Sequence, residues 1–285
     1  MMGSGVLWVL TAEGETYHQG VRQLVRNYFS LEDEVRNLHQ AVAGRVRVAS
    51  IYSIGLSHLH QYVGDFMSRH PQANLRLQYQ HPDEVYDLVQ RDEVDVGLVS
   101  YPKSSRNVEA VAWRDEPMVF VCAPDHPLAS QTSLAPDRLD GLDWIGFDRG
   151  LRIRREIDRF LSSHNAEINM VNEFDDLETI KRAIEINVGV ALLPQPTIVR
   201  EVQLGSLVAI PLAYGESADE PPLHRPLGII YRRGRSQAPT VVRFIKELQE
   251  IDLSVATEDP RLLTSEDRTT DSPVPIRAAD IAERA

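Results

Sequence analysis

The stretch from Gly44 to Ser100 decides the fold, because three strand patterns alternate there with two helix patterns. The strands read GRVRVAS (44–50), NLRLQYQ (74–80) and VDVGLVS (94–100). Between them, IYSIGLSHLHQYVGDFMSRHP (51–71) and DEVYDLVQRD (83–92) carry apolar residues at helical spacing. The third strand is almost entirely apolar, which is typical of a strand buried on both faces. This order implies parallel pairing and an α/β fold.

A second series of the same kind follows. It reads DWIGF (143–147), RIRREIDRFLSSHN (152–165), INMVNEF (168–174), DLETIKRAIEIN (176–187) and VGVALLP (188–194). Between the two series, residues 108–129 predict two strands. After them we expect an edge strand in 205–212, a polar loop over 215–226, a strand in 227–234 and a closing amphipathic helix over 238–251. Residues 252–285 have scattered prolines and few core residues, and predict a disordered tail.

Composition restricts the function classes. The 285 residues carry 42 acidic and 30 basic side chains, a net charge of −12, which argues against broad electrostatic binding to nucleic acid. The single cysteine, Cys122, lies in an apolar run and is interpreted as a buried small hydrophobe. A lone cysteine suits a reducing cytoplasm. We find no signal peptide and no apolar run long enough to span a membrane, so a cytoplasmic protein is expected.

Residues 12–42 predict one helix about 45 Å long, with Thr11 as its N-cap. Its apolar side chains recur in steps of three and four, which is a heptad seam. A helix packed on its own domain is one interpretation, but so narrow a seam fits a partner helix better, and a second copy of the chain is the simplest partner. The predicted dimerisation residues are Val21, Leu24, Tyr28, Leu31, Val35 and Leu38.

The sequence contains no nucleotide-phosphate motif and no nucleophile elbow. His58 and His60 are two residues apart and do not share a helix face, so we expect no metal pair there. We therefore expect no cofactor, no metal and no enzymatic activity. The densest basic cluster is Arg149, Arg152, Arg154, Arg155 and Arg159. A solvated helix face explains it, with an anion contact by Arg149 or Arg152 as the alternative.

A binding site is the remaining expectation. In open α/β sheets, ligands lie beyond the carboxyl ends of strands, where helix N-termini present their amides. Ser50 ends one strand and Ser53 is placed to cap the next helix. Two such series would face each other across a cleft that holds a small ligand, of anionic character. The predicted effector-binding residues are Ser50, Tyr52, Ser53, Ser100, Tyr101, Phe147, Asp148, Arg149, Asp176 and Pro194.

An ordered series of phrases resembles the LysR-type transcriptional regulators. It runs from LTAEGETYHQGVRQL (10–24) and GRVRVAS through FMSRHPQANLRLQY, VDVGLVSYP and EPMVFVCAPDHPLA to VGVALLPQPTIVREVQLGSLVAIPL (188–212). The resemblance covers about residues 7–250. It implies two Rossmann-like subdomains of periplasmic-binding-protein type, preceded by a long linker helix and hinged at Met118–Ala123 and Pro226–Ile230. It also implies a cytoplasmic homodimer or homotetramer that binds DNA and a small-molecule effector.

The resemblance gives a division of the chain. Residues 1–11 would be the remnant of a winged helix-turn-helix, with Val6–Leu10 as the last wing strand. Residues 12–43 would be the linker and dimerisation helix. Residues 44–122 and 224–251 would form effector subdomain 1, residues 123–223 subdomain 2, and 252–285 the tail. The recognition helix would precede Met1, and we expect an upstream start codon more than a truncation.

Other functions remain open from the sequence. A solute-binding protein would use the same cleft, but the absence of a signal peptide and the linker helix argue against it. A truncated chain could interfere with a full-length regulator by pairing through the heptad helix. Enzymes on related two-lobed scaffolds, prephenate dehydratase and hydroxymethylbilane synthase, would need a Thr-Arg-Phe phrase or a cofactor-bearing loop cysteine. Neither feature is present.

Overall fold

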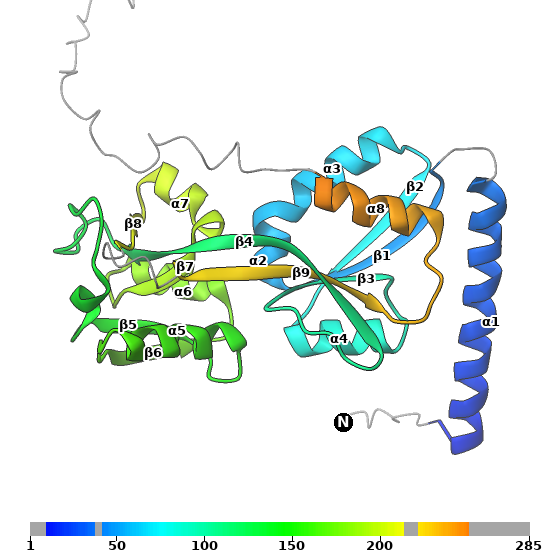
Figure 1. Cartoon of the computed structure of the whole chain (residues 1–285), viewed down its shortest axis with the longest axis horizontal. Helices are drawn as coiled ribbons and strands as arrows, with labels where there is room; N and C mark the ends of the chain where they lie inside the picture. Colours follow the sequence, from blue (N-terminus) through cyan, green and yellow to red (C-terminus); the bar gives the residue numbers. More distant parts are fainter. Residues whose placement is uncertain (1–9, 38–41, 214–221, 251–285) are drawn as a thin grey trace, which may run out of the picture.

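The computed structural model describes residues 10–37, 42–213 and 222–250. Two α/β subdomains lie side by side along the long axis of the molecule, joined by the long strands β4 (Val108–Cys122) and β9 (His224–Arg232) (Figure 1). Helix α1 stands at the outer edge of the first subdomain. This mixed α/β architecture of two subdomains is the one expected from the sequence.

The first subdomain has a sheet in the order β2-β1-β3-β9-β4. Strand β1 pairs in parallel with both β2 and β3, as the strand–helix alternation predicts. Its strands are β1 (Gly44–Ser50), β2 (Ala73–Tyr79) and β3 (Val96–Ser100), and its helical elements are α2 (Tyr52–Ile54), the π-turn η1 (Gly55–Leu59), α3 (His60–Arg69), α4 (Pro82–Gln90) and α8 (Pro239–Glu250).

The core of this subdomain is apolar and aromatic. Val46, Val48 and Leu98 are fully buried in the sheet. Phe66 of α3 meets Phe244 of α8 edge to face, with ring centroids 5.1 Å apart. Such aromatic pairs contribute about 0.5–1.5 kcal/mol beyond the area they bury. Helix α3, from the early part of the chain, is therefore packed against α8, the last helix of this subdomain.

The second subdomain repeats the plan. Strands β5 and β6 pair in parallel, and an isolated parallel bridge joins Trp144 to Val190 ahead of β7. Its elements are η2 (Pro136–Leu139), β5 (Asp143–Phe147), α5 (Arg152–Ser163), β6 (Asn169–Phe174), α6 (Leu177–Glu185), β7 (Ala191–Pro194), η3 (Gln195–Thr197), α7 (Val199–Leu204) and β8 (Val208–Pro211). Cys122 is buried in its core, and burial raises the pKa of the thiol to about 12, so the predicted role as a small hydrophobe is confirmed.

Two long strands connect the subdomains. The two strands predicted within residues 108–129 are one strand, β4 (Val108–Cys122), with a bulge between Ala112 and Arg114. It pairs with β9 (His224–Arg232) in the first subdomain and then with β7 and β8 in the second. Because Met118–Cys122 lies in the second core, the boundary predicted after residue 122 is several residues too late.

Helix α1 (Ala12–Asn37) begins with the Thr11 cap expected from the sequence, since Thr11 Oγ1 accepts a hydrogen bond from the Gly14 amide at 3.1 Å. Arg22 pairs with Glu93 of the first subdomain at 3.1 Å. Leu24, Tyr28 and Leu31 are 69%, 66% and 61% exposed. Three of the six predicted seam residues are therefore largely exposed on α1 in this single chain.

Several expectations concern residues beyond those described. They are the wing strand Val6–Leu10 apart from Leu10 itself, the seam residue Leu38, the side chain of Val35, and the tail after residue 250. Within the described ranges, the helices are all too short or too polar to cross a bilayer.

Candidate functional site: a cavity between the two subdomains

A cavity of about 680 Å³ lies between the subdomains. Six of the ten predicted effector residues line it: Tyr52, Ser53, Ser100, Tyr101, Phe147 and Asp176. The other lining residues are Ile51, Gln80, His81, Pro82, Asp83, Tyr86, Gln90, Lys103, Ser104, Ser105, Gly150, Leu151, Arg152, Ile153, Arg155, Asp175, Leu177 and Arg225. Its size suits a small metabolite.

The start of α2 forms part of the first wall. Ile51 is the N-cap residue, and no side chain caps the helix, so the expectation that Ser53 is the cap is wrong. Ser53 is already helical. Its hydroxyl instead accepts a hydrogen bond from Nη1 of Arg225 at 2.8 Å. An uncapped helix N-terminus leaves amide donors and a positive dipole end, which favour an anion nearby.

Arg225 reaches this wall from β9. Its Nε donates to Glu116 Oε2 at 2.7 Å, and Nη2 donates to the same oxygen. Only 2% of Arg225 and 1% of Glu116 is exposed. The pair therefore joins the two connecting strands out of contact with solvent, and Arg225 is also one of the residues that line the cavity.

Tyr101 follows β3 at the junction of the two subdomains. Its amide donates to the Pro226 carbonyl at 2.7 Å, beside Arg225. Its side chain belongs to the core of the second subdomain, although its strand belongs to the first. Arg152 of α5 holds it from the other side, with the guanidinium carbon 5.6 Å from the ring centroid and Nη1 3.4 Å from the Tyr101 carbonyl.

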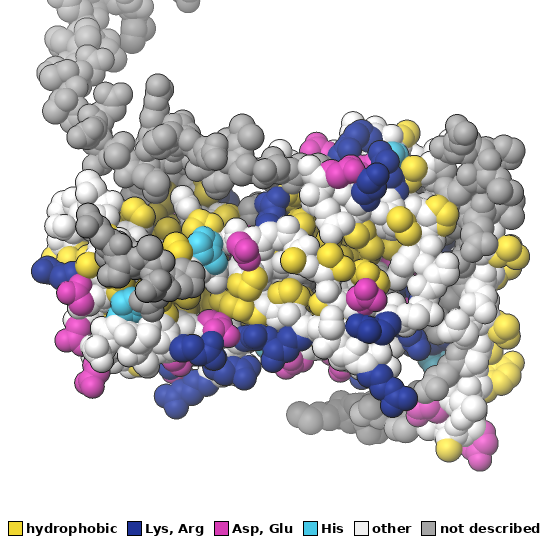
Figure 2. Space-filling model, viewed as in Figure 1, with side chains coloured by type: hydrophobic (Ala, Val, Ile, Leu, Met, Phe, Trp, Pro, Cys, Tyr) yellow, Lys and Arg dark blue, Asp and Glu magenta, His cyan; other side chains and the backbone are white. Residues whose placement is uncertain are grey.

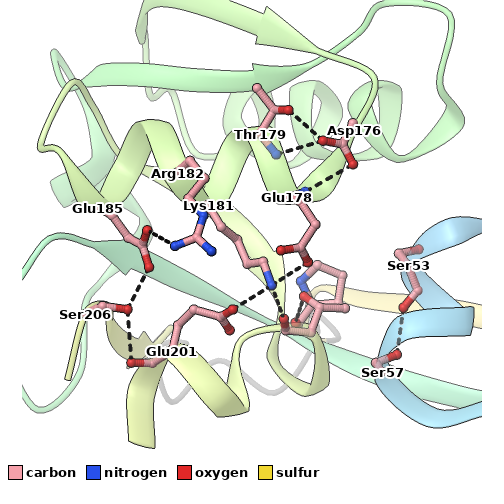
Figure 3. A network of polar contacts seen from close by, with 12 residues as sticks. Ser53, Ser57, Asp176, Glu178, Thr179, Lys181, Arg182, Glu185, Glu201 and Ser206 are labelled. Carbon is pink, nitrogen blue, oxygen red and sulfur yellow. Dashed lines mark hydrogen bonds and ion pairs between the residues drawn. The ribbon is translucent and has the colours of Figure 1, made fainter. Parts of the chain in front are cut away.

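The second wall comes from the starts of α5 and α6. Arg152 and Arg155 belong to the first turn of α5 and line the cavity. Figure 2 shows a group of basic side chains over the region where Figure 1 draws α5. Asp176 caps α6, accepting from the amides of Glu178 and Thr179 and from the Thr179 hydroxyl (Figure 3). Burial alone would raise the pKa of Asp176, but these hydrogen bonds lower it, so the carboxylate stays charged.

Four predicted site residues lie outside the cavity lining. The hydroxyl of Ser50 is buried and donates to the Ile51 carbonyl at 3.0 Å. Asp148 accepts from the Gly150 amide at 2.7 Å and shapes the loop before α5. Arg149 is exposed and pairs with Glu173, and Pro194 is buried opposite Met118. Each of these four residues therefore contacts a neighbouring part of the protein and does not line the cavity.

Sequence reasoning missed most of the cationic lining. The cavity lining contains four cationic side chains, those of Lys103, Arg152, Arg155 and Arg225. It also contains three carboxylates, those of Asp83, Asp175 and Asp176. Arg152 is one of the two residues expected from the sequence as an anion contact, and Arg225 lies at the end of the expected polar loop. The sequence signal that could have found Arg225 is a charged residue next to an apolar strand pattern. Glu116, of opposite charge, lies next to another apolar strand pattern. Within the described ranges, no group of three or more His, Cys, Asp or Glu is placed to hold a metal.

Comparison with known proteins gives the same fold. The RuBisCO operon transcriptional regulator of Allochromatium vinosum is 25% identical over 236 residues, covering 83% of this chain and 76% of the relative. The CcmR regulatory domain of Synechocystis PCC6803, solved in complex with 2-PG, superimposes with a TM-score of 0.63 at 22% identity, covering 76% of this chain and 98% of that one.

Full-length CbnR, a structure solved with its target DNA, superimposes with a TM-score of 0.65 at 17% identity, covering 85% of this chain and 83% of the other. The family model of the LysR substrate binding domain matches residues 39–252, which is most of the chain and includes every residue that lines the cavity. The chain therefore belongs to the LysR family, through the substrate-binding domain that these residues form.

Proposed function

We propose that this chain is a LysR-type transcriptional regulator whose cavity binds a small anionic effector. The observation that carries the proposal is the cavity itself, a space of about 680 Å³ between two subdomains with four cationic side chains in its lining. Binding there contacts both subdomains at once. A ligand that favours one relative placement of the subdomains would shift the population toward it, which is the physical basis of an allosteric response.

The related proteins support this role. A RuBisCO operon transcriptional regulator and a probable nitrogen assimilation transcriptional activator are among them, and both are named as regulators of transcription. One neighbour was solved with the small molecule 2-PG and another with its target DNA. We infer that DNA is a partner of this protein also, and that it works in the cytoplasm, where the chromosome is accessible.

Oligomerisation belongs to the same proposal. Helix α1 exposes Leu24, Tyr28 and Leu31 on one stripe, and an exposed apolar stripe at heptad spacing is stabilised by pairing with a second helix. A homodimer or homotetramer built through α1 would place two effector domains under common control. Regulators of symmetric DNA sites use such assemblies.

The decisive experiment is transcript profiling of a strain that lacks the gene, complemented with the wild-type chain or with Arg152→Glu. We expect deletion to change a limited set of transcripts and the wild-type chain to restore them. Arg152→Glu reverses one charge in the cavity and should fail to restore them. Arg159→Glu is the matched control, since Arg159 lies on the same helix, pairs with Glu156 and is exposed outside the cavity. A deletion that changes no transcript would contradict the proposal.

A further inference from the structure

Helix α4 ends in a corner, residues 91–95, whose backbone is fixed. The amide of Glu93 donates to the Leu88 carbonyl at 2.8 Å. The amide of Asp92 donates to the Val89 carbonyl at 3.1 Å. These two hydrogen bonds form a Schellman motif, and Asp92 has the left-handed conformation that the motif requires, with a φ of +61°. Glu93 is therefore held against the last turn of α4.

Buried charges fix the same corner to the sheet. The side chain of Asp95 is buried and accepts from Nε and Nη2 of Arg47 on β1, at 3.1 and 2.7 Å. The Arg47 amide donates to the same carboxylate at 2.9 Å. Arg235, which follows β9, pairs with both Asp92 and Asp95. Two-point contacts of this kind fix geometry. The corner is thus a rigid part of the first subdomain.

Arg22 of α1 contacts this corner. Its Nη1 donates to Glu93 Oε1 at 3.1 Å, and the two side chains are 41% and 27% exposed. A partly exposed ion pair contributes little when both side chains must be ordered to form it. Here the backbone of Glu93 is already fixed, which lowers that entropy cost. Helix α1 also contacts α8 and β1 of the same subdomain.

The contact uses a different face of α1 from the predicted seam. At 3.6 residues per turn, Arg22 lies on the side of the helix opposite to Leu24 and Leu31. Those two leucines are largely exposed. Contact with the first subdomain therefore leaves the seam free to pair with a second helix.

We propose that the Arg22–Glu93 contact docks α1 on the first subdomain, so that the two move as one unit. The cavity lies between this unit and the second subdomain. A ligand that draws the subdomains together then moves the second subdomain against α1 and leaves the angle between α1 and the first subdomain unchanged. Arg22 and Glu93 are positioning residues, because they set the direction of α1. The consequence for transcription rests on the proposed function, whereas the docking itself does not.

The test measures the distance between α1 and the first subdomain in the whole chain. Nitroxide labels are attached at Glu15→Cys on α1 and at Ser68→Cys on α3, both exposed positions. Cys122 is buried and stays unlabelled. An excess of unlabelled chain leaves at most one labelled chain in an assembly, so pulsed electron spin resonance reports distances within one chain. We expect one narrow distance distribution when Arg22 and Glu93 are both present.

Arg22→Glu sets two carboxylates against each other and should broaden this distribution. We expect the ratio of docked to undocked chains to fall by about 5-fold, the upper value of a partly exposed ion pair. Glu93→Lys should act in the same way by opposing two cations. The double variant Arg22→Glu with Glu93→Lys exchanges the charges and should narrow the distribution again. A separate structural role of either residue would not be rescued by this exchange.

Arg91→Glu is the matched control. Arg91 lies in the same corner and pairs with Asp87 of α4, so its reversal should leave the distance distribution unchanged. Thermal unfolding of each variant checks the fold. Arg22→Glu should unfold at the wild-type temperature, because Arg22 lies outside both cores. If Glu93→Lys unfolds earlier, through its charge near Arg47, Arg22→Glu decides the docking by itself.

An unchanged distribution in Arg22→Glu would overturn the docking. So would an exchanged pair that folds as the wild type does and is no narrower than Arg22→Glu. In the deletion strain, Arg22→Glu should fail to restore the transcripts and the exchanged pair should restore them. Full restoration by Arg22→Glu would overturn the regulatory role of the contact. A deletion that changes no transcript contradicts the proposed function alone, and the distance measurement still judges the docking.

Discussion

Arg225 and Glu116 form an ion pair in which both side chains are buried from solvent. Desolvation of two charges is expensive, and their attraction offsets it only when the geometry is good and other hydrogen bonds complete it. Here Ser53 completes it. The pair thus fixes the orientation of a guanidinium at the cavity, at a site where β4 and β9 carry the chain from one subdomain to the other.

Removing one partner of this pair should therefore be costly. We expect Arg225→Met to lower the free energy of unfolding by about 3–5 kcal/mol, because Glu116 would remain charged and buried without its cation. The double variant Arg225→Met with Glu116→Leu should recover most of this loss. Urea unfolding measures both. A single variant within about 0.5 kcal/mol of the wild type would contradict the buried pair.

Glu247 of α8 supplies a second residue-level prediction. Burial alone would raise its pKa, but hydrogen bonds from His70 and Arg243 and the charge of Arg69 lower it below the ordinary 4.5. A lowered folded pKa gives stability that is present above the unfolded pKa and is lost as the pH falls through the folded one. We expect stability to decline below about pH 4.5.

Glu247→Gln should remove part of that acid dependence. The variant should be less stable than the wild type at neutral pH, and the difference between the two should shrink as the pH is lowered from 5 toward 3. Urea unfolding at each pH measures it. A constant difference across this range would show that Glu247 contributes through packing and not through its charge.

At the scale of elements, strand β9 is packed so closely at Gly228 that there is no room for a side chain. A Cβ at Gly228 would collide with the Pro102 ring, at 2.5 Å from its Cβ, and would stand 3.0 Å from the Val111 carbonyl oxygen. Neither a proline ring nor a strand backbone moves easily. We expect Gly228→Ala to cost about 1–3 kcal/mol in the free energy of unfolding.

Gly64 of α3 is the matched control for this substitution. Nothing lies within 4 Å of its Cβ position, and it is exposed on a helix. Gly64→Ala should stabilise the protein by up to about 1 kcal/mol, since glycine is a poor helix former. Chemical unfolding of the two variants gives opposite signs if the packing of β9 is as described, and equal signs would contradict it.

The elements themselves were largely predictable from local pattern. Alternation gave β1 and β2, helical spacing gave α4, α5, α6 and α8, and an apolar run gave β3. The single strand β4 was not predictable, because the polar segment Trp113–Pro117 interrupts its apolar pattern. Pairing with β9, more than one hundred residues later, keeps the strand extended through that segment. A contact so distant in sequence leaves no local signal.

At the scale of the whole molecule, the parts of the candidate site that depend on local pattern could be predicted from the sequence. The parts that depend on contacts distant in sequence could not. Strand ends located Ser100, Tyr101 and Phe147, because each lies at or just after the carboxyl end of a strand and ligands bind beyond such ends. Arg225 depends on Glu116, 109 residues away, and could not be found from spacing. Ser50 and Asp148 sit at strand ends too, but local hydrogen bonds turn their side chains to the backbone.

The assembly of the molecule gives the last prediction. Leu24 and Leu31 are exposed on α1 one heptad apart, so Leu24→Asp with Leu31→Asp should place charge in the seam and separate the copies. We expect sedimentation to show the wild type as a dimer or tetramer and the variant as a monomer. The two subdomains of the variant should stay folded, because these side chains are not part of either core. Leu204→Asp is the control, since Leu204 is 71% exposed on α7 of the other subdomain, and it should leave the assembly intact. An unchanged oligomer in the double variant would exclude the α1 stripe as the interface. The exposed apolar stripe of α1 would then need a partner other than a second copy of this chain.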